Sequence, residues 1–212
     1  MNQNIRKVNY VEEYKKQLKK NILKVRGSIS KPDMVLKIKN HSDKFNRDYE
    51  EVENKILSDD MYAEIFAKDP NKQNIYEKLA AQYIKTIPDV QNFKNLPNNY
   101  DLFVVDGVIT NKRGNDVKSV DFIFEFKNKN IYSVHKYIKA LNGGAQTNQY
   151  NDVRNFLRNC KKINTGDDYF IAICDGDFFT NKIELLNEEF GSFRVKILTI
   201  EEFERFLNNL PI

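Results

Sequence analysis

Two carboxylates and a lysine occur in this sequence at a spacing that suits phosphodiester chemistry. Asp106 lies in Val-Asp-Gly-Val-Ile-Thr, and Glu125-Phe126-Lys127 ends an apolar run about twenty residues later. Converging carboxylates offer the hard oxygen ligands that Mg²⁺ prefers, and such an ion stabilises charge on a phosphorane. A lysine one pleat further along can position the attacking water or neutralise developing charge. These residues therefore predict metal-assisted hydrolysis of a phosphodiester.

A β-hairpin would bring the three residues together. The sequence predicts strands over 102–110 and 117–127, separated by a polar loop. If that loop is centred near Asn115, Asp106 lies opposite Glu125 at about 5 Å between Cβ atoms. Glu125 and Lys127 then share a face, because side chains alternate along a strand. Asp101 is the alternative first acid, if the turn is tight at Gly114.

Apolar spacing predicts the elements around this hairpin. Helices are expected over 10–25, 45–56 and 70–85, and residues 34–39 alternate weakly, as in a short strand. After the hairpin come helix 145–159, strand 169–174, a short helix over 182–190, strand 193–200 and helix 201–207. This order predicts an α/β (α+β) fold, in which a mixed central sheet is flanked by helices. Residues 1–70 form a mainly helical N-terminal extension, and 71–212 form the core.

Composition narrows the possible locations and chemistries. The apolar fraction of 41% is enough for a real core. No apolar run reaches the roughly 18 residues of a membrane span, and the N-terminus lacks the apolar segment of a signal peptide. We therefore expect a cytoplasmic protein. Cys160 and Cys174 are expected to be reduced, and no P-loop is present.

Basic residues are concentrated in two segments. Residues 1–40 hold eleven Lys or Arg against three acids, and residues 126–162 hold eight against Asp152 alone. A polyanionic partner would need such segments, because neutralising phosphates supplies most non-specific affinity for nucleic acid. The alternative is that these lysines are the solvated faces of helices.

The stretch from Val105 to Lys127 resembles the PD-(D/E)XK nuclease superfamily, and restriction endonucleases in particular. The core of that family is a helix, a β-hairpin carrying the acids and the lysine, a second helix and a further strand. Val-Asp-Gly resembles its Pro-Asp-Gly-type strand with Val105 in place of proline, and Glu125-Phe126-Lys127 fits without change. The resemblance implies Mg²⁺ held by Asp106, Glu125 and the Phe126 carbonyl. It implies that Lys127 is the catalytic lysine.

Two further positions fit the resemblance. Glu77 stands in the helix before the hairpin, where many members carry a glutamate near the metal. Gln146 and Tyr150 match the Gln-x-x-x-Tyr pattern of the exonuclease branch, which places Gln146 at the rim of the site. Glu77 is otherwise a solvated or ion-paired residue, and Gln146 and Tyr150 are otherwise packing residues. Candidate DNA contacts are the N-terminal basic helix and Lys136, Lys139, Gly144, Gln149, Arg154 and Arg158.

The expected function is that of a type II restriction endonuclease, which hydrolyses double-stranded DNA at a specific sequence and leaves 5′-phosphates. The resemblance implies a homodimer and a cognate DNA methyltransferase as functional partner. The alternatives are a structure-selective or repair nuclease, such as a Holliday junction resolvase, and a non-catalytic DNA-binding module. His41 and His135 are expected at the surface. Asp175 and Asp177 are expected in a turn after a core strand.

Overall fold

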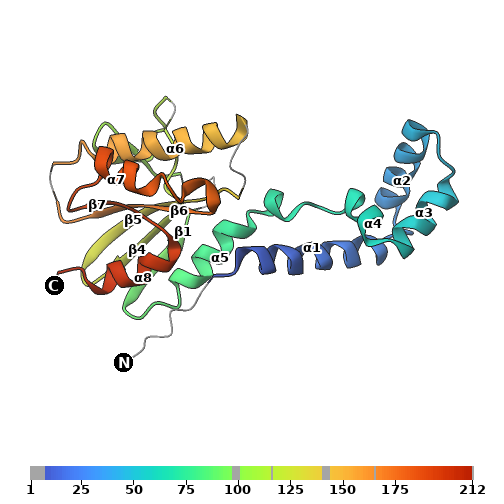
Figure 1. The fold of residues 1–212 in the computed structure, drawn as a ribbon, viewed down its shortest axis with the longest axis horizontal. Helices are drawn as coiled ribbons and strands as arrows, with labels where there is room; N and C mark the ends of the chain where they lie inside the picture. The colour runs from blue at the N-terminus through green and yellow to red at the C-terminus, as the bar shows by residue number, and fades with distance from the viewer. Residues whose placement is uncertain (1–7, 97–100, 116, 140–143, 165, 212) are drawn as a thin grey trace. The chain divides into compact units, whose positions relative to one another are not determined.

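The chain forms two compact units in this computed structural model (Figure 1). The structure describes residues 8–96, 101–115, 117–139, 144–164 and 166–211. The first unit is Asn9–Ile75, and the second consists mainly of Tyr76–Ile212. None of the described helices combines the length and the apolar character needed to cross a membrane.

The first unit is helical. Its elements are α1 (Tyr10–Arg26), α2 (Pro32–Phe45), α3 (Tyr49–Ser58), α4 (Asp60–Phe66) and the 3-10 helix η1 (Pro70–Gln73). The strand predicted over 34–39 is wrong, because α2 covers these residues. Pro32 occupies the first turn of that helix, where a missing N–H costs nothing. Met34 and Ile38 lie one turn apart and are both buried in the core of the unit.

The second unit is built on a five-stranded mixed sheet with the order β1-β4-β5-β6-β7. The strands are β1 (Val90–Asn95), β4 (Phe122–Phe126), β5 (Lys129–Tyr137), β6 (Tyr169–Asp175) and β7 (Val195–Leu198). β1, β4 and β5 pair antiparallel, whereas β6 is parallel to both β5 and β7. The predicted mixed α/β architecture is thus confirmed.

Helices cover both faces of this sheet (Figure 1). On one face lie α6 (Gly144–Cys160) and α7 (Ile183–Phe190), where Phe156 and Leu186 join a buried cluster with Val134 and Ala172. On the other lie α5 (Ile75–Ile84) and α8 (Ile200–Asn208). The ring of Phe203 there meets Phe124 edge-on, at 6.0 Å between centroids.

The predicted hairpin between 102–110 and 117–127 is wrong. Residues 103–110 instead fold back on themselves as β2 (Phe103–Val105) and β3 (Val108–Thr110), a separate two-stranded sheet. Asp106 and Gly107 form the turn with φ of 47° and 81°. An Asp-Gly pair is among the strongest signals for a two-residue hairpin turn, because both positions need positive φ. The local turn therefore outcompetes the longer pairing.

The real partners of β4 are β1 and β5. Glu125 pairs with Gln91 of β1 and with Asn130 of β5. The β4–β5 turn is again two residues, Lys127 and Asn128, with φ of 48° and 60°. The sheet consequently has two opposite ends. At the turn end β4 runs into β5, and at the other end, called here the carboxyl end, β5 and β6 finish and β4 begins.

Candidate functional site

Glu125 and Lys127 lie at the turn end of the sheet. They line a small cavity of about 220 Å³ with Asp89, Gln91 and Asn128. Lys127 Nζ donates hydrogen bonds to the backbone oxygens of Asn208 and Leu210 at 3.2 and 3.1 Å. Phe126 lies beside it, with its buried ring 5.6 Å from that ammonium. Lys127 therefore binds the carbonyl of the last residue of α8 and a carbonyl just beyond the helix.

Asp106 lies elsewhere, at the tip of the β2–β3 hairpin. Its carboxylate pairs with Lys162 at 2.6 Å, and its backbone N–H donates to Asn159 Oδ1 at 2.7 Å. It lines a cavity of about 560 Å³ that contains neither Glu125 nor Lys127. Asp101, the alternative, lines a third cavity. The expected facing of Asp106 and Glu125 is wrong, because the strand that carries Asp106 does not pair with β4.

Replacing Lys127 by alanine should lower stability and leave the predicted DNA cleavage unchanged. A cation at a helix C-terminus contributes about 0.3–1 kcal/mol, which corresponds to a fall in melting temperature of roughly 1–4 °C. Thermal unfolding and plasmid cleavage measure the two effects, with Lys196→Ala as a control of equal charge. Loss of cleavage at unchanged melting temperature would reinstate Lys127 as the catalytic lysine.

A different set of ionisable residues gathers at the carboxyl end of the sheet. Asp121 immediately precedes β4, His135 lies near the end of β5, and Asp175 ends β6. All three are buried. Ligands of α/β proteins commonly bind beyond the carboxyl ends of parallel strands, which is where β5 and β6 finish here. The expected surface position of His135 is wrong, since the residue is 5% exposed.

Asp121 and Asp175 organise this end of the sheet through hydrogen bonds. Asp121 Oδ1 accepts from Lys118 Nζ at 2.5 Å, and its Oδ2 accepts from the backbone N–H of His135 at 2.8 Å. Asp175 Oδ2 lies 3.2 Å from His135 Nε2, and Asp175 Oδ1 accepts from the backbone N–H of Ile200 at 3.0 Å. Asp175 thus joins β6, β5 and the first turn of α8.

Glu77 of α5 belongs to the same group. Burial raises the pKa of its carboxyl above the ordinary value, and the nearby charge of Asp121 raises it further. Lys118, His135 and a side-chain hydrogen bond with Asn95 act in the opposite direction. A partly desolvated carboxyl beside a second carboxylate is where a positive ion or a proton is most needed. Of the predicted metal ligands, Glu77 therefore has the most suitable surroundings.

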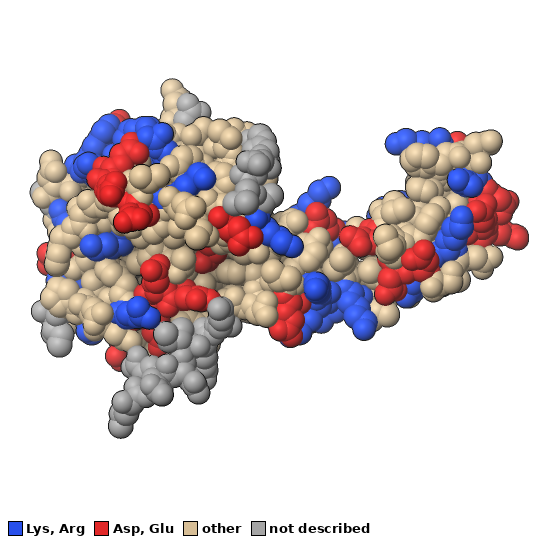
Figure 2. Space-filling model, in the orientation of Figure 1, with Lys and Arg blue, Asp and Glu red and all other residues tan. Residues whose placement is uncertain are grey.

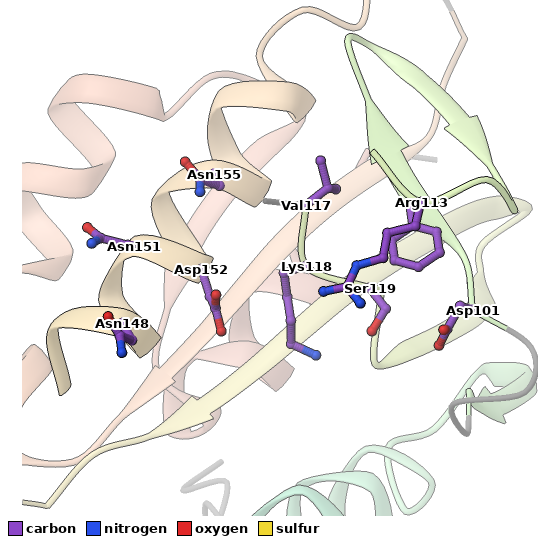
Figure 3. A pocket seen from close by; sticks show the side chains of 10 residues that line it. Asp101, Arg113, Val117, Lys118, Ser119, Asn148, Asn151, Asp152 and Asn155 are labelled. Atoms are coloured by element: carbon purple, nitrogen blue, oxygen red, sulfur yellow. The ribbon is translucent and has the colours of Figure 1, made fainter. Parts of the chain in front are cut away.

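A cavity of about 840 Å³ opens beside this group, and Lys118 is part of its wall. Figure 3 shows Asn148, Asn151, Asp152 and Asn155 on the α6 side, with Asp101, Arg113, Lys118 and Ser119 facing them. Lys118 joins the cavity to the carboxylates, because its ammonium also binds Asp121. A ligand in the cavity that contacts Lys118 would therefore lie close to the cluster of buried carboxylates around Asp121.

The residues on and near α6 that are predicted to belong to the site or to contact DNA differ in burial and in whether they are ion-paired. Gln146 Oε1 is buried and has no hydrogen-bond partner among the described residues, whereas Tyr150 packs against Phe178 and Phe179. Lys136 pairs with Asp152 at 3.1 Å, and Arg154 pairs with Glu189. Lys139 is exposed, Gln149 is partly exposed and Gly144 begins α6; Gly143 lies outside the described residues. Two of the predicted DNA contacts are therefore already ion-paired.

Neither unit, taken by itself, shows a uniformly basic surface on the side drawn in Figure 2. Lys and Arg are interspersed there with Asp and Glu. Two lysines of the first unit are ion-paired along their own helix, Lys16 with Glu12 and Glu13, and Lys55 with Glu51. Of the lysines in residues 1–40, Lys16 thus belongs to a solvated helix face.

The fit to Mg²⁺ rests on two side chains. In the part of the chain that the structure describes, no three His, Cys, Asp or Glu residues are arranged to hold a metal ion. Mg²⁺ often uses only one or two protein carboxylates and completes its shell with waters and substrate phosphates. Glu77 and Asp121 are the candidates for that smaller requirement, because the charge of Asp121 acts on Glu77. Asp106 and Glu125 are not, since they line separate cavities.

Sequence reasoning missed Asp121, Lys118 and His135 as members of a site. Asp121 lies within the predicted strand 117–127, four residues before Glu125, and the Glu125-Phe126-Lys127 motif led to Glu125 being chosen instead. The signal that was present is the Asp-Gly turn at 106–107, which excludes the longer hairpin. No family model, curated protein or solved structure matches this chain.

Proposed function

We propose that the protein is a Mg²⁺-dependent DNA nuclease whose active site lies at the carboxyl end of the sheet. The single observation that carries the proposal is the buried carboxylate of Asp121, which binds the ammonium of Lys118 in the wall of an open cavity. The charge of Asp121 also raises the pKa of the partly buried Glu77. The order of α5, the β4–β5 hairpin, α6 and β6 supports it, because this is the core order of the nuclease family described above. Sequence-specific cleavage of both strands by a homodimer is the form of activity proposed.

Each residue of the group has a distinct proposed role. Glu77 and Asp121 would hold the ion, which when bound would polarise the phosphodiester and lower the pKa of a water. Lys118 lies between Asp121 and the cavity, so its ammonium is placed to neutralise charge on a phosphate that enters there. The backbone N–H of His135 holds Asp121 Oδ2, which makes His135 a positioning residue.

Asp121→Asn should reduce plasmid cleavage in Mg²⁺ by about 100-fold or more, because it removes a charge from the proposed ion site. The matched control is Glu125→Gln, which neutralises the acid at the turn end and should leave cleavage unchanged. Circular dichroism and thermal unfolding establish that both variants fold. Loss of cleavage in Glu125→Gln and retention in Asp121→Asn would reverse the assignment in favour of the turn end.

The same digestion separates the forms of activity. Discrete bands support a restriction endonuclease, and cutting confined to branched junctions supports a structure-selective nuclease. A non-catalytic DNA-binding module is the second candidate, favoured by the lack of a three-residue metal group among the described side chains. Binding without cleavage by the wild-type protein, in Mg²⁺ and Mn²⁺ alike, would establish that candidate instead.

A further inference from the structure

Two neighbouring cavities lie along α6. The cavity of about 840 Å³ and that of about 560 Å³ share Val117 and Asn155 in their walls. One side of the combined space is α6, and the other is the β2–β3 hairpin with the chain around Arg113 and Ser119. This combined space is called here the α6 groove. It begins at Lys118, beside the carboxylate group, and ends at Lys162.

The α6 side of the groove is a row of asparagines. Asn148, Asn151, Asn155 and Asn159 line it. These positions recur every three or four residues, so they share one face of the helix, while Val153 and Phe156 on the opposite face are buried in the core. At 1.5 Å per residue the row is about 16 Å long, which equals roughly five nucleotides of a DNA strand.

The outer asparagines and the inner ones differ in what they contact. The side chains of Asn148 and Asn151 are exposed and form no hydrogen bond with the side chain or backbone of another described residue. Asn159 binds the backbone N–H of Asp106, and Asn155 Oδ1 accepts from Arg158 at 2.7 Å. Near Lys118 the groove therefore presents the exposed side-chain amides of Asn148 and Asn151. Near Lys162 the amide of Asn159 binds the β2–β3 hairpin.

The charges of the groove favour a polyanion. Among the described residues of its lining, Arg113, Lys118, Arg158 and Lys162 are basic, and Asp101, Asp106 and Asp152 are acidic. Asp106 pairs with Lys162, Asp152 pairs with Lys136 from outside the lining, and Lys118 pairs with Asp121. Arg113 and Arg158 are therefore the lining cations that form no ion pair with another described residue. Asparagine amides and cationic side chains are both common donors to phosphate oxygens and need no particular base.

We propose that the α6 groove holds one strand of the nucleic acid, with asparagines 148 and 151 and the basic residues of the lining on its sugar–phosphate backbone. The inference rests on the proposed function, because it is the continuity with Lys118 and Asp121 that directs a phosphate to the carboxylates. It moves the substrate contacts from Lys136 and Arg154, which are ion-paired, to the asparagines of α6 and to Arg113 and Arg158, which form no ion pair with another described residue.

Fluorescence anisotropy with a labelled DNA duplex and with its single strand, in EDTA, tests the groove. The Asn148→Asp, Asn151→Asp double variant places two carboxylates against the phosphates and should raise Kd at least about tenfold, since like charges juxtaposed at an interface are strongly unfavourable. The matched control is Asn128→Asp in the β4–β5 turn, where both Asn and Asp tolerate positive φ. This control should bind almost as the wild type does.

The salt dependence of binding provides a second readout. Arg158→Ala should lower the slope of log K against log salt by about 0.7–0.9 if it removes one phosphate contact, whereas Lys196→Ala should leave the slope unchanged. A larger effect on the single strand than on the duplex assigns the groove to unpaired DNA, and equal effects assign it to one edge of a duplex. Equal Kd values for the aspartate variants and the wild type would overturn the inference.

The two proposals fail in different ways. Binding is measured without metal, so groove variants that weaken it support the groove even if no DNA is ever cut. Cleavage that depends on Asp121 but is indifferent to the aspartates in the groove would retain the proposed function and refute the groove. A wild-type protein that binds neither DNA form would refute both.

Discussion

Replacing Glu77 by glutamine should raise the melting temperature and, in the same variant, abolish Mg²⁺-dependent cleavage. The folded protein raises the pKa of this carboxyl, first through burial and then through the charge of Asp121. The folded state therefore binds the proton of Glu77 more tightly than the unfolded state does. It follows that ionised Glu77 lowers stability once the pH rises through the folded-state pKa.

Glutamine is nearly isosteric and uncharged, so the gain should appear at pH 7–8 and shrink towards pH 4, where Glu77 is protonated in both states. Each kcal/mol gained would raise the melting temperature by about 2–4 °C in a chain of this size. Cleavage should fall by about 100-fold or more, because a ligand of the proposed ion is lost. Thermal unfolding across this pH range and plasmid digestion give both readouts.

The control for this prediction is Glu184→Gln, an exposed acid in the first turn of α7, which should alter stability little and cleavage not at all. A purely structural Glu77 would behave differently: its removal would change melting temperature without a matching change in cleavage by a folded protein. A Glu77→Gln variant that melts lower than the wild type at pH 8 would refute the electrostatic argument.

Asp175→Ala should be strongly destabilising. Its carboxylate is 6% exposed, accepts the backbone N–H of Ile200 and lies 3.2 Å from His135 Nε2. Leaving a buried hydrogen-bonding group without its partner costs about 1–3 kcal/mol, which corresponds to a fall in melting temperature of roughly 2–12 °C for each group. Chemical denaturation gives the free energy of unfolding directly.

Asp177 supplies the comparison, because it is an exposed acid two residues further along the same chain segment. Asp177→Ala should stay within about 0.5 kcal/mol of the wild type. If the two alanine variants were equally stable, the link from β6 to α8 through Asp175 would contribute nothing measurable. His135→Gln should fall between them, because it keeps the backbone N–H that binds Asp121.

Local patterns in the sequence were enough to predict the fold class, but they did not predict which strands pair. Helical spacing located α1, α5 and α6 to within a few residues. β1 was missed because Val90–Asn95 is mostly polar and carries an irregularity between Gln91 and Lys94. β5 was missed because it contains His135 and Lys136 at positions that read as surface. Pairings between distant segments leave weaker traces in a sequence than turns do.

The candidate site was predicted in part. Glu77 was located correctly on the helix before the sheet, because a lone acid on a small apolar face is visible without knowing the pairing. The assignment of Asp106, Glu125 and Lys127 to one site depended on the assumed pairing of 102–110 with 117–127. Because that pairing is wrong, the residues do not come together. The positions of Asp121 and His135 follow from β4–β5 pairing, which only the three-dimensional structure supplies.

The β2–β3 hairpin is fastened at both of its ends. At its base Val120 N–H donates to Leu102 O at 2.7 Å and Phe103 bridges to Ser119, while its tip is held to α6 through Asp106. A wall anchored in this way keeps its spacing from the helix before any ligand arrives. The conformational entropy of this wall is lost when the chain folds, before any ligand binds. A nucleic-acid strand that enters the groove therefore meets a preorganised surface, and its binding does not include the cost of ordering the wall.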